Sequence, residues 1–159
     1  MKLLILVSTG DTQASTNNDL KEIKSAAEKL SVLQLGKSGI FPSFEGAEKE
    51  AAIILAERLN LDVLETIQMK WGKDERKKRC AELVVNFVSE KYQYEKFDSV
   101  ILVSGSTQLK HIARSIDANQ PLPLYLKYGE MLIIDKETKK VYYINKYAPH
   151  THHQIKSRQ

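Results

Sequence analysis

The chain has 159 residues, of which 42% are hydrophobic and 28% charged, with seven glycines and four prolines. These values are typical of one globular domain and exclude collagen-like repeats and intrinsic disorder. The formal net charge is +4, with the excess of bases in residues 69–80 and 136–159. Most of the bases are lysines, which bind phosphate and guanine less specifically than arginines do, so we expect a solvated surface and no nucleic-acid partner.

The compartment is indicated by two features. The longest apolar run near the start, residues 3–7, is shorter than a membrane helix (about 20 residues) or a signal-peptide core (about 7–15). A single cysteine, Cys80, excludes an internal disulfide framework. We therefore expect a soluble cytoplasmic protein with no membrane partner. No Cys/His spacing indicates a metal site, and the three histidines near the end lack a fixed framework, so we expect neither metal nor cofactor.

The chain opens with a strand, a loop and a helix. Residues 3–7 form a continuous hydrophobic run that predicts a buried strand, and the polar residues 8–12 predict the loop after it. Apolar residues then recur at helical spacing over 19–30, which predicts an amphipathic helix. The candidates for its N-cap are Asn17, Asn18 and Asp19.

The next segment repeats this alternation less clearly. Residues 32–41 contain two glycines and predict a short strand. Pro42 and Ser43 end that strand and introduce a helix that continues to about Asn60. Residues 62–69 alternate in part, which fits either a strand or an extended connection.

The second half of the chain gives clearer signals. Residues 73–91 predict the longest helix, and 98–103 a second buried strand. Another helix follows, because Leu109, Ile112, Ala113 and Ile116 share one helical face. Residues 124–134 and 140–147 then predict the two strands of a hairpin.

Strands that alternate with helices predict an α/β fold, here a three-layer α/β/α sandwich with a mainly parallel central sheet. We expect residues 1–148 to form this single domain and residues 149–159 to form a flexible C-terminal tail. Ligands of such sheets bind in the loops at the carboxyl ends of the strands. The loops at 8–12 and 104–107 are therefore the candidate site.

Both loops combine glycine with hydroxyl groups. We take the candidate ligand-binding residues to be Ser8, Thr9, Gly10, Ser104, Gly105 and Ser106. Their backbone N–H groups could hold a phosphate or carboxylate, although the same residue types are ordinary turn and cap residues. Neither loop contains a His, Cys or Lys, so neither offers an activated nucleophile.

Several segments, in the same order, resemble the histidine phosphatase superfamily, also called phosphoglycerate mutase-like, and most of all its small phosphohistidine phosphatases. Residues 2–12 are similar to the family's first strand with its Arg-His-Gly-Glu-Thr signature. Residues 52–61 resemble the helix after its Ser-Pro-x-x-Arg-Ala loop, and residues 99–106 the strand that carries its Ser-His-Gly. Residues 124–147 are similar to its closing hairpin. The resemblance spans about residues 2–148 and implies the same fold.

The catalytic positions of that family are replaced in this chain. Thr9 stands where the resemblance expects the phosphoryl-accepting histidine, and Ser8 where it expects the preceding arginine. Gly105 occupies the position of the second histidine, and Gly46 or Ala47 that of the second arginine. Without the imidazole nucleophile and its cationic clamps, phosphoryl transfer by the family's route has no support.

The sequence therefore favours a catalytically inactive member of the superfamily that binds an unknown protein or a small anionic ligand at the vestigial phosphate pocket. One alternative is a hydrolase with replaced catalytic residues, in which Asp11, Asp74 or Glu75 does acid/base chemistry. Another reads residues 8–12 as a flavodoxin-like loop that binds flavin mononucleotide. The family's tendency to dimerise also leaves a homodimer open.

Overall fold

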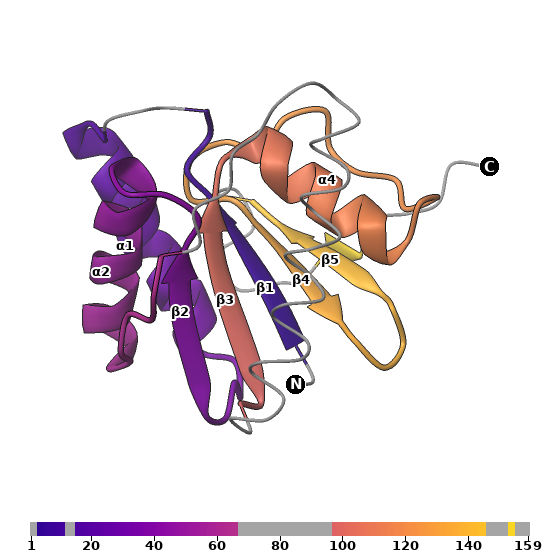
Figure 1. Ribbon diagram of the computed structural model, residues 1–159, viewed down its shortest axis with the longest axis horizontal. Helices are drawn as coiled ribbons and strands as arrows, with labels where there is room; N and C mark the ends of the chain where they lie inside the picture. The colour runs from indigo at the N-terminus through magenta and orange to yellow at the C-terminus, as the bar shows by residue number, and fades with distance from the viewer. Residues whose placement is uncertain (1–2, 12–14, 67–96, 146–152, 155–159) are drawn as a thin grey trace.

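One mixed sheet organises the molecule (Figure 1). The computed structural model describes residues 3–11, 15–66, 97–145 and 153–154. The helices are α1 (Asn17–Ser31), α2 (Ala47–Leu59) and α4 (Ser106–Ile116). The strands are β1 (Leu3–Ser8), β2 (Ser38–Pro42), β3 (Ser99–Ser104), β4 (Met131–Asp135), β5 (Val141–Ile144) and β6 (His153–Gln154).

The sheet has the strand order β2-β3-β1-β4-β5-β6. Strands β2, β3 and β1 are mutually parallel, whereas β4, β5 and β6 each run antiparallel to the preceding neighbour. The α/β class is thus confirmed, and so is the predicted hairpin, which is β4–β5. The sheet is mixed because this hairpin extends it from β1, so the parallel part is confined to the first three strands in that order.

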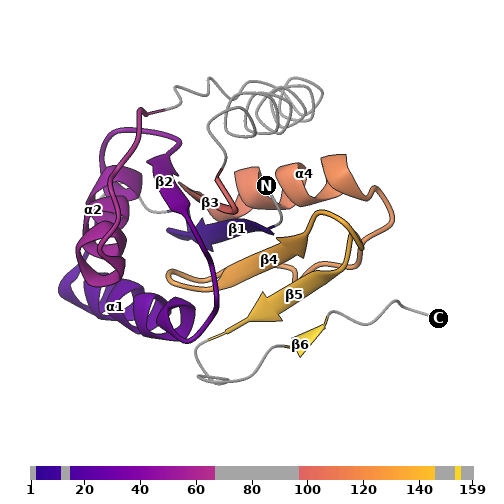
Figure 2. The same cartoon turned by 90° about the horizontal axis from the view of Figure 1, so that it is seen from below.

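Helices cover both faces of the sheet (Figure 2), which confirms the three-layer sandwich. Side chains alternate along β1: Leu4 and Leu6 belong to the core beneath α4, and Ile5 and Val7 to the core beneath α1 and α2. This alternation follows from the period of two residues in a strand. Both faces of the strand are buried, which is why its sequence reads as a continuous hydrophobic run.

The start of α1 differs from the sequence prediction. Its N-cap is Thr16, whose hydroxyl accepts a hydrogen bond from the backbone N–H of Asp19 at 3.2 Å. The Asp19 carboxylate accepts one in return from the N–H of Thr16 at 2.9 Å. This capping box places Asn17, Asn18 and Asp19 inside the first turn, so the prediction that one of them is the N-cap was wrong.

The segments after β2 were predicted as a helix to about Asn60, an extended connection and a long helix at 73–91. Helix α2 begins at Ala47, after a bend at 43–46, and Val63 forms an isolated bridge with Ile40, in agreement with an extended connection at 62–66. The predicted helix at 73–91 and most of the predicted tail fall outside the described residues. Within the described part of the chain, no helix has the length and apolar character needed to span a bilayer.

Candidate functional site at the carboxyl edge of the sheet

The two predicted loops lie side by side. Strands β1 and β3 are paired so that Ser8 faces Ser104. The backbone N–H of Thr9 donates to the carbonyl oxygen of Ser104 at 3.0 Å, and that of Ser106 donates to the carbonyl oxygen of Gly10 at 2.7 Å. All six candidate residues therefore meet at one edge of the sheet, and the two loops are joined by backbone hydrogen bonds.

The hydroxyl groups of this edge bond to other parts of the protein. Ser8 Oγ donates to the carbonyl oxygen of Leu126 at 3.0 Å and accepts from the N–H of Gly10 at 2.9 Å. Ser106 Oγ accepts from the N–H of Leu126 at 2.8 Å. Both serines are fully buried. These hydroxyls hold the 124–130 segment against the strand ends, as turn and cap residues do.

Ser43 adds a third buried hydroxyl, which the sequence analysis did not single out. Its Oγ donates to Ser104 Oγ at 2.8 Å, and its backbone N–H donates to the carbonyl oxygen of Val103 at 2.9 Å. Ser43 follows β2, so it connects the third parallel strand to the same edge. The hydrogen bond between Ser43 and Ser104 joins residues 61 positions apart, so no local sequence pattern could predict it.

A carboxylate lies beside the candidate residues. Glu48, in the first turn of α2, is partly buried and lies beside the Thr9 side chain. Burial raises the pKa of the Glu48 carboxyl above its ordinary value, and the backbone N–H of Glu48 and the nearby Thr9 hydroxyl oppose that rise. The sequence analysis missed Glu48, although it follows directly on the position, Gly46 or Ala47, at which the resemblance expects an arginine.

Other groups at this edge are also acidic. Burial raises the pKa of the Tyr128 hydroxyl, and the negative charges of Asp19, Glu50 and Glu48 raise it further. Lys49, the nearest base to the position where the resemblance expects an arginine, is directed to Glu45, with Nζ 3.2 Å from the carboxylate. Among the described residues, the charged side chains around this edge are therefore mainly carboxylates, which are unfavourable for a phosphate.

Asp11 links the two loops to the 124–130 segment. Its backbone N–H donates to the Tyr125 hydroxyl at 3.2 Å, and its Oδ1 lies 3.5 Å from the backbone N of Thr107 in the first turn of α4. An acidic group near a helix N-terminus is favourable. The Asp11 carboxylate therefore occupies part of the space in which an anion would bind at the N-terminus of α4.

Gly105 is tightly enclosed. A Cβ at this position would lie 2.5 Å from Gln108 Oε1 and 3.1 Å from the carbonyl oxygen of Gly10. The first contact could be relieved by moving a side chain, but the second is to backbone. Residue 105 must therefore be small in this arrangement of the loops.

The described residues contain no group of three or more His, Cys, Asp or Glu that could hold a metal ion. Asp74 and Glu75, the other acids considered for catalysis, lie outside the described residues. Within the described part of the chain, the edge offers hydroxyls and carboxylates, and none of its residues is a His or Cys.

No family model matches the chain, and no curated protein does. Several solved structures, however, match the chain. A protein from Agrobacterium tumefaciens described as a phosphohistidine phosphatase matches with a TM-score of 0.64, at 12% identity over 91% of this chain and 96% of that one. The mycobacterial glucosyl-3-phosphoglycerate phosphatase matches with 0.61, at 14% identity over 91% and 97%. Phosphoglycerate mutase from Plasmodium falciparum matches with 0.61, at 17% identity over 94% and 92%.

The chain has the phosphoglycerate mutase-like fold. The matches cover almost the whole length of both partners, so this fold accounts for the chain as one unit rather than for a shared fragment. The flavodoxin-like alternative does not fit, because a flavodoxin sheet is parallel throughout, whereas here β4 and β5 are antiparallel. In the phosphoglycerate mutase-like fold of this chain, Thr9, Gly105 and the N-terminus of α2 meet at the carboxyl edge.

Proposed function

We propose that this chain is a non-catalytic member of the histidine phosphatase superfamily that acts by binding. The observation that supports this most directly is the environment of Thr9, whose side chain lies beside the Glu48 carboxylate. Phosphoryl transfer by the superfamily's route needs an imidazole nucleophile and positive charge around the phosphoryl oxygens. A hydroxyl beside a carboxylate supplies neither an imidazole nor positive charge.

The hydrogen bonds and charges of the two loops also indicate which kind of partner this edge of the sheet could bind. Among the N–H groups of the two loops, those of Thr9, Gly10 and Ser106 already donate to protein atoms. The side chains that would face a ligand there include Glu48 and Asp11. Both features act against a small anion, so of the two partner classes expected from the sequence, a protein is favoured over an anionic ligand.

The test is an activity and binding assay on the purified chain. We expect no turnover of p-nitrophenyl phosphate or of a phosphohistidine peptide, and no change in Tm with millimolar phosphate or vanadate. Turnover that is retained by Thr9→Val but abolished by Asp11→Asn would contradict the proposal and favour an enzyme with replaced catalytic residues. Turnover retained by both variants but abolished by Asp74→Asn or Glu75→Gln would contradict it in the same way, and turnover retained by all four variants would indicate a contaminant. A rise in Tm with vanadate would show that anion binding survives.

A further inference from the structure

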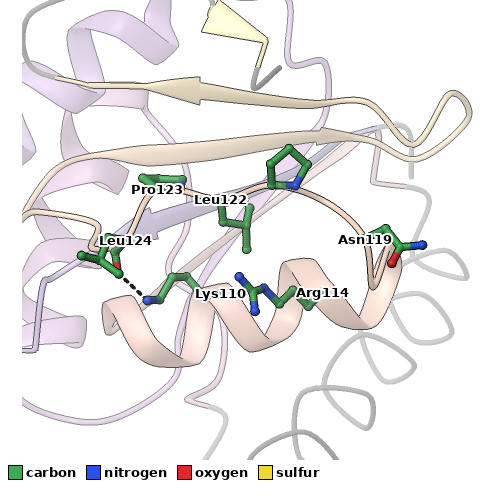
Figure 3. A pocket seen from close by; sticks show the side chains of 7 residues that line it. Lys110, Arg114, Asn119, Leu122, Pro123 and Leu124 are labelled. Atoms are coloured by element: carbon green, nitrogen blue, oxygen red, sulfur yellow. Dashed lines mark hydrogen bonds between the residues drawn. The ribbon is translucent and has the colours of Figure 1, made fainter. Parts of the chain in front are cut away.

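A second concave surface lies away from the strand ends, between α4 and the segment that follows it (Figure 3). The cavity has a volume of about 410 Å³. Side chains of α4 form one wall, and the 119–124 segment forms the other. Its lining residues are Lys110, Arg114, Asn119, Pro121, Leu122, Pro123 and Leu124.

One wall of this pocket is positively charged. Lys110 and Arg114 are four residues apart on α4 and so share one helix face, and both extend toward the facing segment (Figure 3). Lys110 Nζ donates to the carbonyl oxygen of Leu124 at 2.5 Å. No Asp or Glu belongs to the described lining, and no salt bridge joins Arg114 to another described residue. The guanidinium is exposed, and its bidentate geometry suits a carboxylate.

The other wall is apolar and held in place. The side chain of Leu124 is 92% exposed, the largest exposure among the large hydrophobic residues described. Pro121 and Pro123 restrict the backbone that leads to it. The segment is also fastened at Leu124 itself, whose carbonyl oxygen accepts from Lys110, and two residues later by the bond from the N–H of Leu126 to Ser106 Oγ. A partner that covers Leu124 would therefore order little additional chain on binding.

We propose that this pocket binds an acidic peptide segment of another protein. Carboxylates of that segment pair with Arg114 and Lys110, and an apolar side chain beside them packs against Leu122 and Leu124. The inference goes beyond the function proposed above and does not depend on it, because the pocket and the strand-end site share no lining residue. It would stand even if the chain hydrolysed phosphate esters.

The occupant follows from the composition of the walls. Arginine is enriched at protein interfaces, and Arg114 here adjoins an apolar surface formed by Leu122 and the exposed Leu124. The charge of the pocket selects an acidic segment, and the net charge of +4 on the chain opposes association with a second copy. The described wall facing α4 consists of Asn119 and of proline and leucine side chains, which give nucleic-acid bases no aromatic surface on which to stack.

The test uses an array of eight-residue peptides that each carry two or three Asp or Glu and one Leu, Phe or Trp. A matched array replaces every acid by its amide. We expect binding to members of the first array at low salt, at least tenfold weaker binding to their amide counterparts, and amide chemical-shift changes confined to residues around 110–125. Arg114→Glu is expected to weaken binding at least tenfold, and Leu124→Ser severalfold.

Two variants serve as matched controls. Lys24→Glu reverses an exposed base on α1, and Val32→Ser removes an exposed hydrophobic side chain, both on the opposite side of the sheet. Neither is expected to change peptide binding. The proposal is wrong if no acidic peptide binds, if Arg114→Glu binds as well as the wild type, or if single-stranded RNA binds in place of the peptides. Dimerisation that Arg114→Glu abolishes would also overturn it, because a second copy would then occupy the surface.

Discussion

Glu48 has the strongest effect on the chemistry of the strand-end site. Its carboxylate lies beside Thr9, close to the position where the resemblance expects a cationic clamp. The sequence predicts that the family's histidines and arginines are replaced in this chain, since those positions follow from the segments that resemble the family. The sequence did not show which groups the serine hydroxyls of the two loops bond to. Ser8 bonds to Leu126, 118 residues away, and such a contact exists only once the sheet has formed.

Replacing Glu48 by Gln tests the electrostatic account. The folded-state pKa of Glu48 is raised, so the folded state binds more protons than the unfolded state above about pH 4.5. Wild-type stability should therefore fall as the pH rises through that raised pKa, and in Glu48→Gln this decline should vanish. At pH 7 the variant should be more stable by less than about 1 kcal/mol, because solvent screens a partly exposed group.

Urea denaturation between pH 4.5 and 7.5 measures this difference. Glu57→Gln, on an exposed position of the same helix, is the control and should leave the pH profile unchanged. A Glu48→Gln variant that is less stable than the wild type at pH 7 would show that the bond with Thr9 outweighs the cost of burying the charge.

At the scale of the elements, the sequence predicted which helices and strands exist better than it predicted the residues at which they begin and end. The strands β1 and β3 are buried on both faces, so a continuous apolar run identified them. The helices α1 and α4 have one buried face each, and their apolar spacing identified them as well. The start of α1 was placed wrongly because several neighbouring polar residues could cap a helix, and the choice among them is made by a reciprocal pair of hydrogen bonds.

The capping box of α1 gives a prediction at this scale. Thr16→Ala removes the hydroxyl that accepts from the N–H of Asp19, and should lower the free energy of unfolding by about 1 kcal/mol. Asn17→Ala changes only a residue of the first turn and should alter stability by less than about 0.5 kcal/mol. Urea denaturation of the two variants decides between the caps. Equal effects would mean that the box does not control the helix start.

At the scale of the whole molecule, the central strands join two cores. Leu102 of β3 lies in the core beneath α4, whereas its neighbour Ile101 lies in the core beneath α1 and α2. Both are fully buried. The two cores share the same backbone, so loss of packing on one face should be transmitted to the other. The sequence predicted this layering because the strand runs are apolar at every position, which requires cover on both faces.

Leu102→Ala should therefore lower the free energy of unfolding by about 2–5 kcal/mol, the range for a buried leucine that leaves a cavity. The unfolding transition followed by far-UV circular dichroism should still coincide with that followed by the NMR ring signals of Tyr128, which belongs to the opposite core. Leu124→Ala, at an exposed position, should cost less than about 0.5 kcal/mol. Separate transitions in Leu102→Ala would show that the two faces unfold independently.

The hydrogen bonds that tie the loop after β1 to the loop after β3 have a consequence for any attempt to engineer phosphatase chemistry into this chain. Replacing Thr9 and Gly105 by histidine would supply the two imidazoles of the family's site. A side chain at position 105, however, would contact the carbonyl oxygen of Gly10, which already accepts a hydrogen bond from the N–H of Ser106. To admit that side chain, the main chain between the two strand tips would have to shift by a few tenths of an ångström, and Glu48 would have to be neutralised as well. The backbone geometry of the two loops thus limits such engineering together with the side chains at the strand ends.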